Sequence, residues 1–106
     1  MELYYNLGIS VGLACNMRHN FCYQSSFHHA RISDEILYDK LADFYGRSNY
    51  ISVLGGELTV IEGMKEYLRY LRSRNDRAII SIVTNGSRFD EEWLRLCIDH
   101  RISVNF

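Results

Sequence analysis

The stretch Leu7-Gly-Ile-Ser-Val-Gly-Leu-Ala-Cys15-Asn-Met-Arg-His19-Asn-Phe21-Cys22-Tyr23 begins as a short apolar strand and runs directly into a polar loop. That loop carries two cysteines and a histidine in the spacing C-x3-H-x2-C, so the three side chains can converge on one centre if the loop wraps around it. Thiolates and an imidazole suit zinc, and less directly an iron–sulfur cluster. The alternative is that Cys15 and Cys22 are ordinary buried cysteines and His19 a surface histidine.

The composition is that of one folded domain. The chain has 106 residues, a net charge of −1, 47% hydrophobic and 24% charged residues, which excludes a disordered or fibrous chain. It has no apolar run long enough for a membrane span and no signal-peptide pattern, so we expect a cytoplasmic protein with no membrane partner. An odd number of cysteines, three, favours ligand or core roles over a disulfide framework.

Strand and helix patterns alternate along the chain. Apolar runs predict strands at about residues 6–12, 50–54, 78–83 and 101–106. Between them, apolar stripes predict three helices. The first has Leu37, Leu41, Phe44 and Tyr45 on one side, and the second opens at Thr59 with Ile61, Met64, Leu68 and Leu71. The third, at about 91–99, is capped by Asp90 and has Trp93, Leu94 and Cys97 on one side. This alternation predicts an α/β fold with a parallel sheet of about four strands and three helices.

A serine recurs within each predicted strand, flanked by Ile or Val. Because side chains alternate along a strand, the flanking residues share one face and the serines the other. The serines are Ser10, Ser52, Ser81 and Ser103. One apolar and one partly polar face are typical of a curved sheet that lines a site, so we expect a barrel-like half-shell.

Three predicted strands end in loops that could carry chemistry. These are the Cys/His loop, Gly55-Gly56-Glu57 and Thr84-Asn85-Gly86. Parallel strands bring such loops to one rim, where the active sites of these folds lie. Glycines let a backbone approach a ligand closely, and a glutamate can hold an ammonium group. Gly-Gly-Glu alone could equally be a tight turn before a helix.

Taken together, these motifs resemble the radical S-adenosylmethionine (SAM) enzymes. The signature of that family is C-x3-C-x2-C after the first strand, with an aromatic residue before the last cysteine; here it stands as Cys15 to Cys22 with Phe21. The family's Gly-Gly-Glu-Pro appears as Gly55-Gly56-Glu57-Leu58, and its frequent Thr-Asn-Gly as Thr84-Asn85-Gly86. The motifs occur in order over nearly the whole chain.

The resemblance implies an incomplete TIM-like (βα)6 barrel that holds a [4Fe–4S] cluster and SAM. The reduced cluster would cleave SAM to a 5′-deoxyadenosyl radical, which abstracts hydrogen from a substrate. By position, the cluster ligands would be Cys15, His19 and Cys22, and the cofactor-binding residues Phe21, Gly55, Gly56, Glu57, Ser81, Thr84 and Asn85. The expected partners are a reductant such as flavodoxin or ferredoxin and an unknown substrate, a small molecule, peptide or RNA.

Two departures from the family pattern affect these expectations. His19 stands where the family has its middle cysteine. Histidine in place of thiolate raises the potential of an iron–sulfur cluster and so weakens it as a reductant. The site could therefore bind a cluster poorly, hold a His-ligated cluster, or hold zinc. In addition, residues 1–106 correspond to about the first half of the family's core domain, so the sequence predicts a truncated domain with impaired activity.

Two further functions stay open at this stage. A zinc-binding module could use Cys15, His19, Cys22 and either His28 or His29, which would complete a tetrahedral set. A catalytically inactive scaffold or pairing module would instead self-associate through the open edge of an incomplete barrel.

Overall fold

The computed structural model of this protein describes residues 5–12, 32–55 and 57–106. In chain order its elements are β1 (Tyr5–Ser10), a π-helical segment η2 (Glu35–Lys40), α1 (Ala42–Gly46), β2 (Ser48–Leu54), a 3₁₀ turn η3 (Leu58–Val60), α2 (Met64–Arg74), β3 (Ile79–Val83), α3 (Glu91–Asp99) and β4 (Ile102–Asn105). None of the helices within these ranges is long and apolar enough to span a bilayer.

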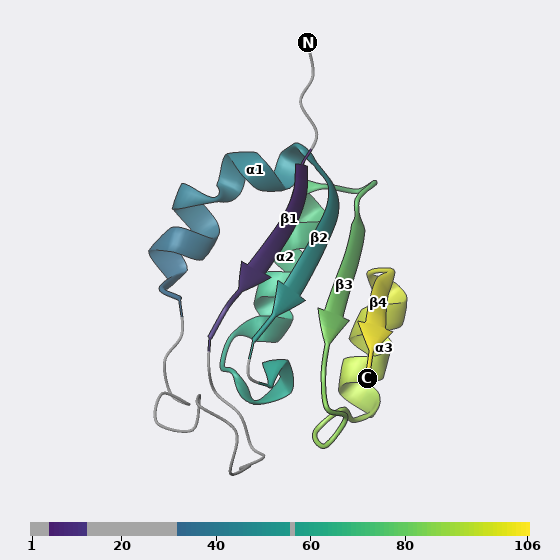
Figure 1. Cartoon of the computed structure of the whole chain (residues 1–106). Coiled ribbons are helices and arrows are strands. Elements are labelled where there is room, and N and C mark those ends of the chain that lie inside the picture. Colours follow the sequence, from purple (N-terminus) through teal and green to yellow (C-terminus); the bar gives the residue numbers. More distant parts are fainter. Residues whose placement is uncertain (1–4, 13–31, 56) are drawn as a thin grey trace.

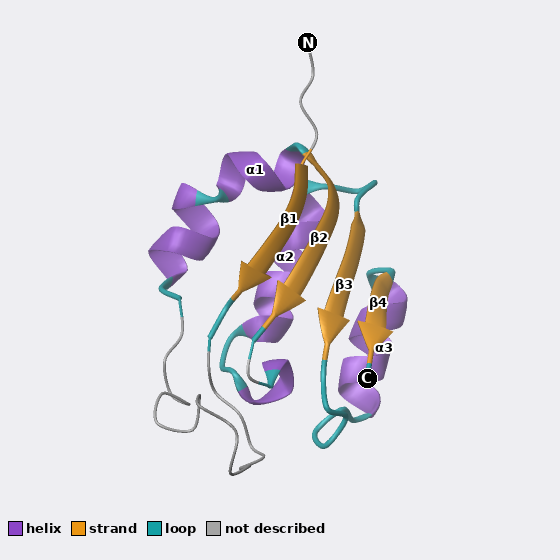
Figure 2. Ribbon diagram, viewed as in Figure 1, coloured by secondary structure: helices purple, strands orange, loops and turns teal. Residues whose placement is uncertain are grey.

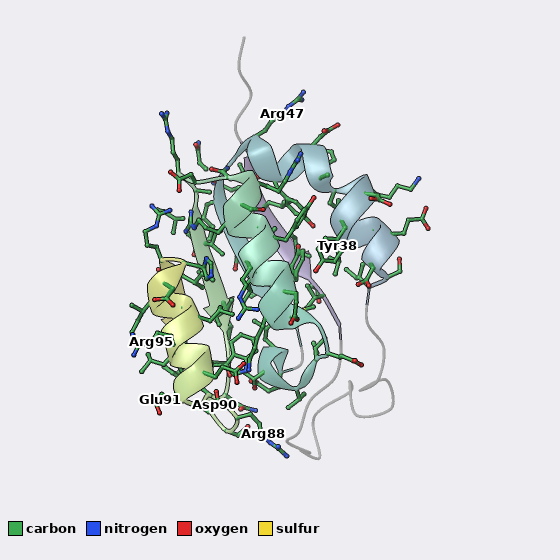
Figure 3. The ribbon with its side chains drawn as sticks, turned by 180° about the vertical axis from the view of Figure 1, so that it is seen from behind. Tyr38, Arg47, Arg88, Asp90, Glu91 and Arg95 are labelled. Carbon is green, nitrogen blue, oxygen red and sulfur yellow. The ribbon has the colours of Figure 1, made fainter. Side chains whose placement is uncertain are left out.

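The four strands form one parallel sheet in the order β1-β2-β3-β4. Helices α2 and α3 cover one face of it, and within the described ranges no helix covers the other (Figures 1 and 2). Seen from behind, the two helices lie in front of the strands, with Arg47 at the amino-end edge and Arg88 and Asp90 at the carboxyl-end edge (Figure 3). This is the parallel α/β arrangement that the sequence predicts.

The helix-covered face is built from the predicted β-branched residues. Ile9, Val11, Ile51, Val53, Ile80, Ile82 and Ile102 are all buried, and Val104 packs against them partly buried. They meet α2 and α3 through residues such as Leu68, Leu71 and Trp93. Strand alternation therefore identified the core face correctly, because burial on one side of a sheet follows the two-residue period.

The serines share the opposite, open face, as predicted, but they do not all lie opposite one another across the strands. Ser52 lies opposite Gly8 and Ser81, and Ser81 lies opposite Ser103. Ser10 is offset by two residues and lies opposite Leu54. This face is also more apolar than predicted, since Ile79 is 57% exposed there.

The edge strands of this sheet are β1 and β4. An edge strand presents unpaired backbone groups that can pair with another chain. Self-association through an open edge of the sheet stays a prediction.

The first helix departs from the predicted apolar stripe. Leu37 and Tyr45 are buried as expected, but Phe44 is 42% exposed, so that part of the prediction is wrong. The reason is the π-helical segment η2, in which Leu41 N–H donates to the carbonyl of Ile36, five residues back, at 3.0 Å. The wider turn rotates the residues that follow and moves Phe44 off the buried side.

The second helix begins five residues later than predicted, at Met64 instead of Thr59. Thr59 does not form a capping box, because its N–H and hydroxyl both donate to the Glu57 carboxylate. The chain instead turns at Gly63, whose φ of 85° suits glycine, before α2 starts. From there the predicted stripe holds, and Tyr67 joins it as a buried residue.

The third helix begins where predicted, and its cap is confirmed. Asp90 accepts a hydrogen bond from the N–H of Trp93 at 2.9 Å. Trp93, Leu96 and Cys97 face the sheet, whereas Leu94 is exposed, so its predicted place in the core is wrong. A residue one position after Trp93 points about 100° away around the helix.

Four tyrosines fill the space between the first helical segments and α2. The Tyr45 hydroxyl donates to the carbonyl of Leu37 at 2.8 Å, so it accepts from the Tyr67 hydroxyl, also at 2.8 Å. Tyr38 packs against Tyr70 at 4.7 Å between ring centroids (Tyr38 is labelled in Figure 3). Burial, which disfavours the phenolate, raises the pKa of both Tyr45 and Tyr67.

A buried arginine organises the amino-end edge of the sheet. Arg72 is 8% exposed and donates to the carbonyls of His100 at 2.8 Å, Ala78 at 2.8 Å, Arg101 at 3.0 Å and Asn75 at 3.1 Å. These acceptors come from the connections α2–β3 and α3–β4, so a single side chain holds both connections against the end of α2. The planar guanidinium, with five donors, suits this geometry better than an ammonium group does.

We expect Arg72→Met to lower the free energy of unfolding by about 3 kcal/mol, because it removes the Arg72 donors from four backbone carbonyls in buried or partly buried hydrogen bonds. Arg74→Met, an exposed position at the end of the same helix, should have a much smaller effect. Urea titrations that follow helix circular dichroism give both values. Equal midpoints for the two variants would contradict the role assigned to Arg72.

Candidate functional site

The candidate site lies at the carboxyl-end edge of the sheet, toward which all four arrowheads point (Figure 2). Three chain segments of the described residues meet there: Val11 and Gly12, which follow β1, the segment after β2, and the segment after β3. Because the strands are parallel, their last residues and following loops are brought to the same rim.

The ends of β1 and β2 are packed directly on each other. Val11 N–H donates to the carbonyl of Leu54 at 2.9 Å. A Cβ atom at Gly55 would lie 3.1 Å from the carbonyl oxygen of Gly12 and 3.3 Å from Cδ1 of Ile61. Gly55 is therefore needed for the packing of its own chain, a requirement that the Gly-Gly motif does not reveal in the sequence.

The segment after β2 is joined to the segment after β3 by the Glu57 carboxylate. Glu57 is 1% exposed. Its Oε2 accepts from Thr59 N–H at 2.9 Å, from the Thr59 hydroxyl, and from the Thr84 hydroxyl at 2.6 Å. Its Oε1 accepts from Asn85 N–H at 2.6 Å. One buried charge thus bonds to donors on both loops.

These hydrogen bonds keep Glu57 ionised. Burial raises the pKa of the carboxyl, but the hydrogen bonds from the Thr59 and Thr84 hydroxyls and from the Asn85 and Thr59 backbone N–H groups outweigh it. The pKa of Glu57 therefore lies below its ordinary value. Hydrogen bonds of this charge-assisted kind are short and strong, so the carboxylate holds its donors firmly.

The loop after β3 has its own internal bonds. Thr84 N–H donates to the carbonyl of Asn105 at 2.9 Å, which continues the β3–β4 pairing. Asn85 Oδ1 accepts from Ser87 N–H at 2.9 Å and from the Ser87 hydroxyl at 2.6 Å. Gly86 has a φ of +81°, and a Cβ there would lie 3.2 Å from the ring of Phe106. Glycine is required at this turn for its backbone conformation and for the close approach of that ring.

Ser81, a predicted cofactor-binding residue, lies on the open face but is itself buried. The Tyr50 hydroxyl bonds to Ser81 Oγ at 2.9 Å. Tyr50 lies opposite Ile79 of β3 and is 37% exposed. Tyr50 was not identified from the sequence as a residue of the open face of the sheet. The spacing of two residues between Tyr50 and Ser52 could have shown that both lie on that face.

Some predicted site residues lie outside the described part of the chain. They are Cys15, His19, Phe21, Cys22, His28, His29 and Gly56. Among the residues that the structure does describe, no group of three or more His, Cys, Asp or Glu side chains could hold a metal ion. The predicted metal ligands therefore stay a prediction, whereas Gly55, Glu57, Thr84 and Asn85 are brought to one rim.

Comparison with family models identifies the chain. The model of the radical SAM superfamily matches residues 9–106. The chain belongs to the radical SAM superfamily. No curated protein sequence matches it.

The fold of this radical SAM chain is similar to that of a solved structure, the crystal structure of selenomethionine BtrN in an open conformation. The TM-score is 0.71 at 16% sequence identity, over 98% of this chain and 56% of that chain. The chain thus spans little more than half the length of this structure. At this identity the likeness concerns the fold, and it agrees with the predicted partial barrel of parallel strands and helices.

Replacing Glu57 tests the buried carboxylate. Glu57→Gln puts an amide NH₂ among hydrogen-bond donors, so we expect a loss of about 2–4 kcal/mol in the free energy of unfolding at neutral pH. Since the folded-state pKa is lowered, the contribution of Glu57 is full above the ordinary glutamate pKa of about 4.3 and is lost as the pH falls through the lower folded-state value. Denaturant titrations across this range should show the gap between wild type and variant narrowing in acid.

The control for this experiment is Glu66→Gln, which removes an exposed carboxylate from α2. It should have a much smaller effect at neutral pH. A gap between wild type and Glu57→Gln that stays constant down to strongly acid pH would contradict the role of the ionised carboxylate.

Gly55→Ala and Gly8→Ala form a matched pair. A methyl group at Gly55 meets the Gly12 carbonyl, so a backbone segment must shift, at a cost of about 1–3 kcal/mol. A methyl group at Gly8 meets nothing within 4 Å, so this change should be neutral or stabilise by about 0.5–1 kcal/mol. Thermal unfolding of both variants distinguishes these outcomes, and equal destabilisation would show that Gly55 is not tightly packed.

Proposed function

We propose that this chain provides the cluster- and SAM-binding part of a radical SAM enzyme. The observation that carries the proposal is the hydrogen bonding of Glu57 to Thr84 and Asn85. Through it, two loops that resemble family motifs stand side by side at the carboxyl ends of adjacent parallel strands. In such folds that rim is where ligands bind.

The described residues suit a ligand held mainly by the backbone. Gly55 presents no side chain, and the side chains of Glu57 and Thr84 are buried within the rim. In our proposal the Gly55-Gly56-Glu57 segment meets the amino group of the methionine part of SAM. In the same proposal Phe21 packs near the adenine of SAM, and Ser81, Thr84 and Asn85 line the cavity that holds the cofactor.

The proposed cluster ligands are Cys15, His19 and Cys22, whose thiolate and imidazole groups are ligands of known iron–sulfur clusters. When bound and reduced, a [4Fe–4S] cluster supplies the electron for reductive cleavage of SAM. The electron would come from a protein such as flavodoxin or ferredoxin, and the substrate would be a small molecule, a peptide or an RNA.

The histidine sets the expected behaviour of this site. An imidazole in place of a thiolate removes a negative charge from the ligand set and raises the cluster potential. We therefore expect wild-type protein to assemble less cluster, or a cluster that is harder to use as a reductant. Restoring a thiolate at position 19 should correct both.

The test is anaerobic reconstitution with iron and sulfide, followed by absorbance and EPR spectra with and without SAM. We expect His19→Cys to take up more iron and sulfide than wild type, and SAM to change the EPR spectrum of its reduced cluster. His100→Cys is the matched control, because it adds a thiol at the end of α3, outside the Cys15–Cys22 sequence motif. It should leave cluster uptake at the wild-type level.

Failure of both wild type and His19→Cys to assemble a cluster would overturn the proposal. Stoichiometric zinc in protein purified from cells, lost in His28→Ala or His29→Ala, would favour the zinc-binding module instead. A defined oligomer that binds neither metal nor SAM would favour the inactive scaffold. Metal analysis and analytical ultracentrifugation of the same preparation separate these outcomes.

A further inference from the structure

Thr84 is the residue through which the loop after β3 reaches the loop after β2. It follows Val83, the last residue of β3, and is 2% exposed. Its hydroxyl donates to Glu57 Oε2 at 2.6 Å and accepts from Gly86 N–H at 3.2 Å. Its backbone N–H donates to the carbonyl of Asn105 at 2.9 Å. Thr84 therefore bonds to the segment after β2, to the end of β4 and within its own loop.

The hydroxyl of Thr84 is directed into the protein. A threonine hydroxyl has a single proton, and here that proton is used in the bond to Glu57. The side chain is almost completely buried, so a ligand on the rim meets little of its surface. Its contribution to ligand binding must therefore pass through the atoms that it holds.

We propose that Thr84 is a positioning residue for SAM binding, which fixes Glu57, in the segment after β2, relative to the Thr84-Asn85-Gly86 loop. The proposal deepens the proposed function and rests on it. The hydroxyl anchors the Glu57 carboxylate from the β3 side, and Asn85 N–H, the next donor along the chain, anchors the other oxygen. Both loops are thereby held in one arrangement before a ligand arrives, and binding is sensitive to small displacements of such groups.

Thr59 provides an internal comparison. Its hydroxyl and N–H also donate to Glu57 Oε2, but Thr59 and Glu57 belong to the same segment, two residues apart. Removing the Thr59 hydroxyl takes away a hydrogen bond to the same oxygen without disconnecting the two loops. Comparing variants of Thr84 and Thr59 therefore distinguishes the loss of a hydrogen bond at Glu57 from the loss of the connection between the two loops.

The experiment compares Thr84→Val, Thr84→Ser and Thr59→Val in anaerobically reconstituted protein that also carries His19→Cys. SAM affinity is measured by equilibrium dialysis at a temperature where circular dichroism shows each variant to be folded. We expect Thr84→Val to weaken SAM binding about tenfold or more, Thr84→Ser to retain affinity within about threefold, and Thr59→Val to lose less than Thr84→Val. Valine keeps the branched shape of threonine, so the hydroxyl is the group tested.

Amide hydrogen exchange, recorded without SAM, gives a second readout that does not depend on the proposed function. In Thr84→Val we expect faster exchange at Asn85 N–H, whose acceptor Glu57 is no longer anchored, with unchanged exchange at core amides such as Ile82. Thr84→Ser should restore the wild-type exchange rate.

The outcomes separate the two proposals. If the His19→Cys parent binds no SAM, the proposed function fails, and the exchange data alone then decide whether Thr84 holds the loops together. If the parent binds SAM and Thr84→Val binds it equally well, the positioning role is overturned. Equal losses of SAM affinity in Thr84→Val and Thr59→Val would also overturn it. The loss would then follow from removing any hydrogen bond to Glu57, and not from disconnecting the two loops.

Discussion

The buried carboxylate of Glu57 is the interaction on which the carboxyl-end rim depends. A buried charge without partners is costly, so the chain must keep hydrogen-bond donors around it. Here the donors come from Thr59 on one loop and from Thr84 and Asn85 on the next. Neither loop can move away without leaving the charge unsatisfied. The geometry of both loops is therefore fixed by the electrostatics of one side chain.

The opposite edge of the sheet uses the same principle with the opposite charge. Arg72 is a buried cation whose donors are satisfied by backbone carbonyls of two connections. Asn75 adds to this edge, since its amide donates to the carbonyls of Tyr45 and Ser48. The amino-end edge thus holds the helices to the sheet, and the carboxyl-end edge holds the loops to each other. Different buried charged residues thus organise the two ends of the strands, and both contribute to stability.

The sequence predicted what depends on local periodicity. The parallel sheet followed from the alternation of strands and helices along the chain, and its apolar face from side-chain alternation in strands such as Ile80-Ser-Ile82. The start of α3 followed from the capping chemistry of Asp90. The errors arose where a distant or non-standard contact overrides the local pattern. Thr59 does not cap α2, because its N–H and hydroxyl donate to Glu57, and Phe44 is exposed because of the π-helical turn. None of these contacts is visible in a linear pattern.

The structure shows that several residues of the rim motifs are needed for contacts within the protein itself. Gly55 is required by the approach of the Gly12 carbonyl, and Glu57 and Thr84 are buried in bonds within the protein. These residues therefore shape the rim mainly from inside. Side chains that are used internally cannot also be the main contacts of a ligand, so in the proposed site the loops would present chiefly their backbone groups to it. Backbone groups recognise a ligand through the path of the chain, and at this rim that path is set by the hydrogen bonds from Thr84 and Asn85 to the Glu57 carboxylate.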